Sequence, residues 1–278
     1  MRLEVDIVRS VACFSDMHVG CYYSLAPEDE VKISKEFTYN PETRNAGQRV
    51  LNQYYSDALK LCDRFEVDTV FLLGDLVDGF SPNERGPSMV NNNINAQEEM
   101  LLNLLEPLVK DRQTHLVCGS QYHESKEYSV YSSIAKSIKP WAKEVFNHQV
   151  IGNIRLSPTD KVFNIAHEST SAMLYTATIL DREHTYIKYA EAMGKLPKID
   201  HYIRGHLHKF YHIDTGYMHL IQVPAWKTWY PIRNKTGLYG RMQSDIGFVI
   251  IMLDEKGRSY FKNFVWNAPH IADPLVMA

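Results

Sequence analysis

Short apolar runs alternate with stretches of helical pattern through the first half of the chain. Residues 8–14, 67–73 and 114–118 are apolar runs of strand length. Between them lie residues 43–65 and 95–110, where apolar side chains recur at the spacing of one helix face. Strands and helices in alternation predict a layered α/β fold.

The pattern changes after residue 145. Strands separated by turns are expected in the segments VFNIAHE, IDHYIRGHLH, YMHLIQVPAW and IGFVIIMLD. Helices are expected at about 127–138 and 171–194. A second sheet packed on the first would give a four-layer α/β/β/α sandwich of two mixed sheets flanked by helices. We find no internal repeat and no low-complexity linker, so we expect residues 1–278 to form a single domain.

Composition limits the classes of partner. The chain has 278 residues with 45% hydrophobic and 23% charged side chains, which is typical of a globular protein with a sizeable core. A net charge of -3 gives no overall attraction for nucleic acid or anionic membrane, so a charged partner must meet a local patch. No apolar run reaches the roughly 18 residues of a membrane span. The oligomeric state is left open by the sequence.

Cysteine usage favours a reducing compartment. Cys13, Cys21, Cys62 and Cys118 form no CxxC pair and are too few for a disulfide scaffold. The first sixteen residues are too polar for a secretory signal. We therefore expect a cytoplasmic protein.

Aspartate and histidine residues follow four of the apolar runs directly. They are Asp16 and His18, then Asp75 and Asp78 after Gly74, then His167, and finally His206 and His208 after Gly205. Sites in layered α/β folds lie at the carboxyl ends of strands, where loops aim several side chains at one point. Aspartate with histidine is a ligand set suited to Mn, Fe, Zn or Ni rather than Ca.

Each of these patterns has an ordinary alternative when it is taken alone. Asp78 has the position of a helix N-cap after a strand. His206 and His208 are also compatible with a surface pair on one strand face, and His167 with a satisfied, half-buried histidine. The joint order of all the patterns, each just after an apolar run, makes chance agreement improbable.

The chain resembles the calcineurin-like metallophosphoesterases from about residue 10 to 255. The resembling motifs are Asp16-Met17-His18, Gly74-Asp75-Leu76-Val77-Asp78, His167 and Gly205-His206-Leu207-His208. The segment VPAWKTWYP and the later DIGFVII are also similar to uncharacterised phosphoesterases of phages and prophages.

The resemblance implies a site with two divalent metal ions, of which Mn is favoured and Fe, Zn, Ni and Mg are alternatives. It places Asp16, His18 and His208 on one metal, and His167 and His206 on the other, with Asp75 shared. A hydroxide bridging metals about 3.5–4 Å apart would attack the phosphorus of a phosphate mono- or diester.

The resemblance also gives His123 the role of protonating the leaving group. Asp78 is similar to the family's partner for that histidine, although Glu124 is an alternative partner.

One ligand position departs from the family pattern. The family writes Gly-Asn-His followed by an acid, and the asparagine binds the second metal, whereas this chain has Gly119-Ser120-Gln121-Tyr122-His123-Glu124. Three interpretations remain: Ser120 takes the asparagine's place, Gln121 does so, or a water completes the site. Each predicts a second metal that is held less tightly, and Ser120 is slightly favoured.

A basic and aromatic stretch indicates a class of substrate. Residues 226–241 read WKTWYPIRNKTGLYGR, with four cations, four aromatic side chains and no acid. Charge and stacking of this kind suit a nucleotide or a single-stranded nucleic acid, and we expect Lys227 and Arg241 to bind substrate. The alternative is a solvated loop whose aromatic side chains cover a sheet edge.

The sequence thus favours a metal-dependent phosphoesterase, with a phosphodiesterase or nuclease as the finer expectation. A binding or scaffold protein that keeps the fold but has lost catalysis is the alternative of another class, and the altered 119–124 stretch argues mildly for it. A metal-dependent hydrolase of another ester has the same ligands and is a third option.

Overall fold

The computed structural model describes residues 5–34, 38–79, 89–120, 123, 130–168, 177–228 and 244–268. The predictions for Gln121, Glu124 and Arg241 lie outside these residues, as does most of the basic and aromatic stretch.

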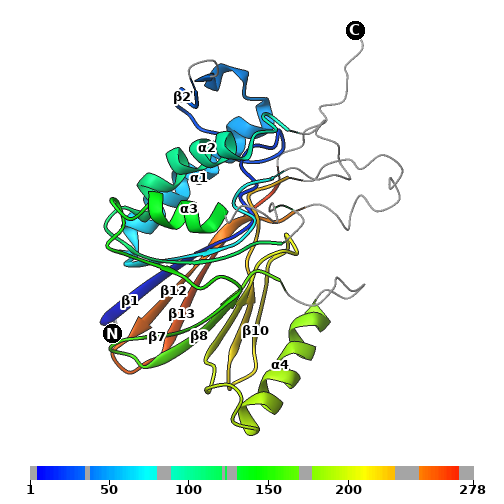
Figure 1. The fold of residues 1–278 in the computed structure, drawn as a ribbon. Helices are drawn as coiled ribbons and strands as arrows, with labels where there is room; N and C mark the ends of the chain where they lie inside the picture. The colour runs from blue at the N-terminus through cyan, green and yellow to red at the C-terminus, as the bar shows by residue number, and fades with distance from the viewer. Residues whose placement is uncertain are drawn as a thin grey trace.

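Six strands form the first sheet (Figure 1). In spatial order they are β13 (Ser259–Trp266), β12 (Ile246–Asp254), β1 (Ile7–Phe14), β4 (Thr69–Leu73), β5 (Gln113–Val117) and β6 (Glu144–Asn147). Strands β1, β4, β5 and β6 run parallel, while β12 is antiparallel to both of its neighbours.

The second sheet has five strands. Their order is β10 (Tyr211–Asp214), β11 (His219–Gln222), β9 (His201–Arg204), β8 (Lys161–Ala166) and β7 (Ile151–Leu156). The central strands β11, β9 and β8 are parallel, and the two edge strands are antiparallel to them. A small two-stranded sheet of β2 (Val31–Lys32) and β3 (Thr38–Tyr39) packs beside α2 and precedes the short 3-10 helix Pro41–Thr43.

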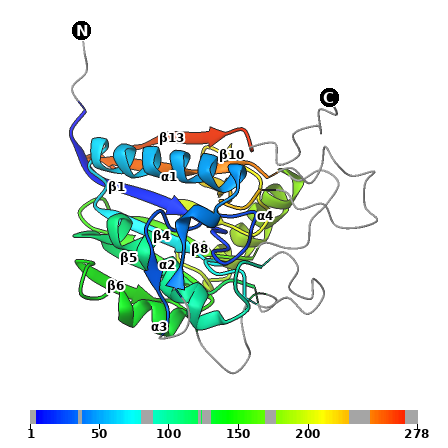
Figure 2. The same ribbon diagram turned by 90° about the horizontal axis from the view of Figure 1, so that it is seen from above.

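Helices cover the two outer faces of the sheets. Helices α1 (Ala46–Arg64), α2 (Ile94–Val109) and α3 (Val130–Ser137) lie on the first sheet, and α4 (Ala177–Ala192) lies on the second (Figure 1). Figure 2 shows α1 near β13 and α3 at the opposite edge, near β6. Asn45 and Gln48 form a capping box that fixes the start of α1.

Alternation along each strand separates the hydrophobic layers. Phe14 and Leu72 face the helices, whereas Cys13 and Phe71 face the space between the two sheets. A third apolar cluster lies between the second sheet and α4. Because both faces of the central strands are buried, their sequences are continuous apolar runs. The expected α/β/β/α order of layers is confirmed.

The loops after β1 and β4 are joined by their backbones. The Asp16 N–H donates to the Gly74 carbonyl at 3.0 Å, and the His18 N–H donates to the Asp75 carbonyl at 2.9 Å. The loop after β9 is tied in by the Gly205 N–H, which donates to the His167 carbonyl at 3.1 Å. The His206 N–H donates to the Asp16 carboxylate at 2.9 Å, so the carboxyl ends of four strands from two sheets meet at one place.

Candidate metal centre

Left-handed backbone is concentrated where these loops meet. Nine described non-glycine residues have a positive φ, and five of them are Asp16 (53°), His18 (47°), Asp75 (47°), His206 (77°) and His208 (53°). Such backbone is uncommon outside glycine and persists only where the surrounding structure enforces it, which occurs often at functional sites. These positive φ values also exclude the alternative that His206 and His208 are neighbours on a regular strand.

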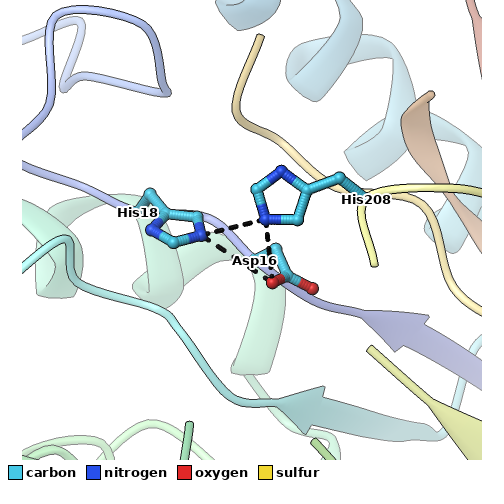
Figure 3. Close-up of side chains that lie close together, drawn as sticks. All are labelled: Asp16, His18 and His208. Carbon is cyan, nitrogen blue, oxygen red and sulfur yellow. Dashed lines mark hydrogen bonds and ion pairs between the residues drawn. The ribbon is translucent and has the colours of Figure 1, made fainter. Parts of the chain in front are cut away.

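The Asp16 carboxylate has one oxygen held by the protein and one that faces histidines. Its Oδ2 accepts hydrogen bonds from the Ser15 hydroxyl at 2.5 Å and from the His206 N–H at 2.9 Å. Its Oδ1 lies 3.2 Å from His208 Nε2 and 3.7 Å from His18 Nε2 (Figure 3). Hydrogen bonds to Oδ2 thus fix the orientation of the carboxylate, and Oδ1 faces the histidines.

The Asp75 carboxylate is held by Ser120. Its Oδ1 accepts the Ser120 N–H at 2.8 Å, and the Ser120 hydroxyl lies 3.2 Å from Oδ1 and 3.1 Å from Oδ2. Its Oδ2 lies 3.0 Å from His167 Nε2 and 4.0 Å from His18 Nε2. A Cβ on Gly119 would overlap Asp75 Oδ1, so the glycine before Ser120 is required for this approach. In this structure Ser120 contacts Asp75, the residue predicted to bridge two metals.

In three histidines, ring nitrogen Nδ1 contacts a polar group of the protein. His18 Nδ1 is 3.0 Å from Asp78 Oδ1, His167 Nδ1 donates to the Leu73 carbonyl at 2.6 Å, and His208 Nδ1 is 3.4 Å from the Ser244 hydroxyl. A neutral ring with its proton held on Nδ1 has its lone pair on Nε2, which is the common arrangement of metal-binding histidines. In all three rings Nε2 is the atom that faces the carboxylates.

Two groups of three donor atoms match the predicted ligand sets. Asp16, His18 and His208 form one, and Asp75, His167 and His206 form the other; within each, the donor atoms all lie within 4.8 Å of one another. Asp16 Oδ1 and His167 Nε2 are buried, and their ionisable partners are His208 Nε2 at 3.2 Å and Asp75 Oδ2 at 3.0 Å.

Burial and close pairs of carboxylate and imidazole groups set the protonation states at the site. Burial alone would raise the pKa of Asp75, but His167 and the neighbouring His18 and His123 lower it below its usual range. Burial lowers the pKa of His167, but the Asp75 and Asp16 carboxylates outweigh this and raise that pKa to about 9. The carboxylates are therefore ionised at neutral pH, as cation binding requires, whereas His167 is protonated in the metal-free centre and must release its Nε2 proton when a cation binds.

His123 lies at the same centre, and its Nε2 is 3.9 Å from Asp75 Oδ2. Its Nδ1 donates to the backbone carbonyl of Asp78 at 2.6 Å, while the Asp78 carboxylate is 3.8 Å away. A third group of donor atoms joins His123 to His18 and Asp75. The expected neighbourhood of Asp78 and His123 is present, with the hydrogen bond made by the backbone instead of the side chain.

The Asp78 carboxylate contacts Lys227 and His18. Lys227 Nζ donates to Asp78 Oδ1 at 2.7 Å, and the Lys227 side chain is only 10% exposed. Backbone bonds hold this segment in place, since the Trp226 N–H donates to the Asp16 carbonyl at 2.9 Å and the Thr228 N–H to the Tyr23 carbonyl at 2.7 Å. Helix α2 begins with Asn93 as its N-cap, so Asp78 is not the cap of that helix.

Several solved structures resemble this chain at low sequence identity. No family model and no curated protein matches it. Among solved structures, an archaeal phosphodiesterase is 13% identical, with a TM-score of 0.45 over 92% of this chain and 99% of the other. Vps29 from Entamoeba histolytica with zinc is 15% identical, with a TM-score of 0.41 over 93% of this chain and 99% of the other.

The phosphoesterase Yfce from E. coli is 10% identical, with a TM-score of 0.40 over 94% of this chain and 100% of the other. These values are too low to define an activity. In the part of the chain that the structure describes, no helix is both long and apolar enough to cross a membrane.

Proposed function

We propose that the protein is a dinuclear metal-dependent phosphoesterase. The observation that carries the proposal is the common orientation of the predicted ligands. In five of the six predicted ligands, one polar atom of the side chain is hydrogen-bonded to another group of the protein, and the second polar atom faces a shared centre. Such preparation of donor atoms is typical of metal sites and is difficult to explain as core packing.

The residues that would hold the cations follow from the two donor groups. Asp16, His18 and His208 would hold one cation, and His167 and His206 the other, with Asp75 Oδ2 shared between them. Two divalent cations at such a site supply Lewis acidity for a phosphoryl group and lower the pKa of water toward neutrality. Manganese is our proposed occupant, with Fe, Zn, Ni and Mg as alternatives.

Ser120 would act on Asp75 through the hydrogen bonds described above. Its role as a direct ligand in place of the family's asparagine remains a prediction. If Ser120 only orients Asp75, the cation beside His167 and His206 has one protein ligand fewer and exchanges more easily.

His123 would assist departure of the leaving oxygen. Burial and the neighbouring His18 lower the pKa of His123 to about 4, so the ring is neutral at neutral pH before substrate binds. A phosphate ester brings negative charge to the centre and raises the pKa of a neighbouring imidazole. Nε2 then carries the proton that a poor leaving group needs, while Nδ1 remains on the Asp78 carbonyl.

The substrate would be a phosphate mono- or diester, and a nucleotide or a nucleic acid remains the finer proposal. Lys227 and Arg241 were predicted to contact it. The Lys227 ammonium is bonded to Asp78, so direct substrate contact would require that ion pair to open. A cytoplasmic location, a single domain over 1–278 and the similarity to phage enzymes also remain proposals.

Hydrolysis of bis-nitrophenyl phosphate by metal-free protein, with and without added Mn²⁺, tests the proposal. We expect nitrophenol release only with the metal. His123→Ala should keep metal binding and lose about 10²–10⁴-fold of the turnover of an ester with a poor leaving group.

Absence of turnover with Mn²⁺, Zn²⁺, Ni²⁺ and Mg²⁺ in turn, together with no bound metal, would contradict the proposal. Metal binding without any turnover would favour the binding or scaffold protein.

A further inference from the structure

A second cluster of histidines lies on the hairpin of β10 and β11. His212 and Asp214 are on β10, and His219 is paired in register with Asp214. Paired residues share one face of a sheet, so these three side chains project from the same face. His219 is paired in register with His201 at the start of β9, and the predicted ligand His206 follows the far end of that strand, whose four residues span about 10 Å at strand rise. The cluster is therefore separate from the candidate metal centre.

Two ring nitrogens face each other in this cluster. His212 Nε2 and His219 Nδ1 are 3.3 Å apart. Two nitrogens bound to a tetrahedral Zn²⁺ at about 2.0–2.1 Å lie roughly 3.3–3.4 Å from each other. The chain contains a useful contrast, since His115 Nδ1 and His148 Nε2 are 2.9 Å apart, the usual length of a hydrogen bond. The spacing on the hairpin thus fits a chelated ion.

Charge and access also fit a cation. Asp214 Oδ1 lies 3.9 Å from His219 Nδ1, and the Asp214 side chain is 62% exposed. The His219 side chain is 23% exposed, so the pair can be reached from solvent. Burial lowers the pKa of both His212 and His219, which keeps the rings neutral at neutral pH, the form that binds metals.

The rings are also restrained from behind. Phe261 of β13 packs against both, with ring centroids 4.3 Å from His212 and 4.5 Å from His219. Restrained rings lose less conformational entropy when an ion binds them.

We propose that His212 and His219 bind one transition-metal ion of the Zn²⁺ class, with Asp214 supplying negative charge on the solvent side. Both facing nitrogens must present lone pairs to the ion. The ring that carries the shared proton in the metal-free hairpin must therefore move that proton to its other nitrogen, and no net proton is released. The ion would cross-link the edge strand β10 to β11. This site does not depend on the proposed phosphoesterase activity.

Zn²⁺ titration of the full chain tests the site, in an Asp75→Asn background that weakens the other centre. We expect the background protein to bind Zn²⁺ at the hairpin, and His212→Ala or His219→Ala to lower that affinity at least about tenfold. His148→Ala removes a ring from the other histidine pair and is the matched control, which should bind as the background does. Equal affinity in all variants, or a loss with His148→Ala alone, would overturn the proposal.

A spectroscopic measurement on the unmutated protein covers the case in which a variant fails to fold. With ¹⁵N-labelled histidine, Zn²⁺ should shift the signals of His212 Nε2 and His219 Nδ1 and leave the His115 and His148 signals unchanged. If the His212 and His219 signals keep their metal-free positions at saturating Zn²⁺, the pair is only hydrogen-bonded and the proposal fails.

Discussion

At the residue scale, the centre depends on side chains that orient other side chains. Asp78 holds His18 and is itself held by Lys227, which is 149 residues away in the chain. The Asp78 side chain is only 2% exposed, so its charge depends on these partners. Burial alone would raise its pKa, yet His18 and Lys227 lower it below its usual range. Lys227 thus has a structural role whether or not it contacts substrate.

Removal of Lys227 should be costly for this reason. Lys227→Met leaves a buried carboxylate without its cation, and such changes typically cost about 3–5 kcal/mol of unfolding free energy. Chemical denaturation of the metal-free protein measures this loss. Asp78→Asn in the same chain should recover part of it.

Lys60→Met is the matched control, because Lys60 pairs with Asp57 on the surface at 3.1 Å and its side chain is 70% exposed. A surface pair of this kind contributes about 0–1 kcal/mol. Equal losses for Lys60→Met and Lys227→Met would refute a special role for the buried pair.

Ser120→Ala should weaken cation binding without unfolding the protein. The change removes the hydroxyl that lies 3.2 Å from Asp75 Oδ1 and 3.1 Å from Oδ2, and it keeps the backbone bond. Loss of a hydrogen bond to a metal-binding side chain typically lowers metal affinity about 10–100-fold.

Calorimetric titration with Mn²⁺ measures this effect. Ser133→Ala, which removes the hydroxyl bonded to Glu98, is the control. An unchanged Mn²⁺ affinity in Ser120→Ala would show that Ser120 does not support the centre.

At the element scale, the central strands and their ends could be predicted from the sequence. The runs ending before Asp16, Asp75, His167 and His206 are buried on both faces, so they are distinct in sequence. Strands β7 and β13 were not predicted, because β7 alternates buried and exposed residues and β13 has no fully buried residue, so both give a weaker signal. The Lys227–Asp78 pair could not be predicted either, since no local pattern records contacts between distant segments.

Strand β9 should make the fold sensitive to acid through its first residue. His201 is fully buried, stacks on Phe163 and bonds Ser259, and burial lowers its pKa to about 3. Because this pKa lies below the usual 6.5, the unfolded chain binds the proton more tightly. The stabilisation is present above pH 6.5 and is lost as the pH falls toward 3.

As the pH falls from 7 to 4.5, protonation of His201 in the unfolded chain should lower the free energy of unfolding by about 2–3 kcal/mol. His201→Gln removes the titration, so the loss measured for metal-free protein over this interval should be smaller by about that amount. An identical pH dependence in the variant would assign the acid sensitivity to other groups.

At the scale of the whole molecule, the four layers bring together loops from two sheets. Asp16 and Asp75 come from the first sheet, and His167, His206 and His208 from the second. Neither sheet alone supplies a complete ligand set, because the first donor group takes His208 and the second takes Asp75 across the interface. Packing of the sheets through the inner core is therefore what assembles the centre.

The most direct test of the central claim is a crystal structure of the full chain grown with Mn²⁺ and phosphate, with anomalous diffraction used to locate the metal. Our account predicts two Mn²⁺ peaks about 3.5–4 Å apart. One should lie among Asp16, His18 and His208, and the other among Asp75, His167 and His206, with phosphate on both. No Mn²⁺ among these six residues at saturating metal would contradict the account.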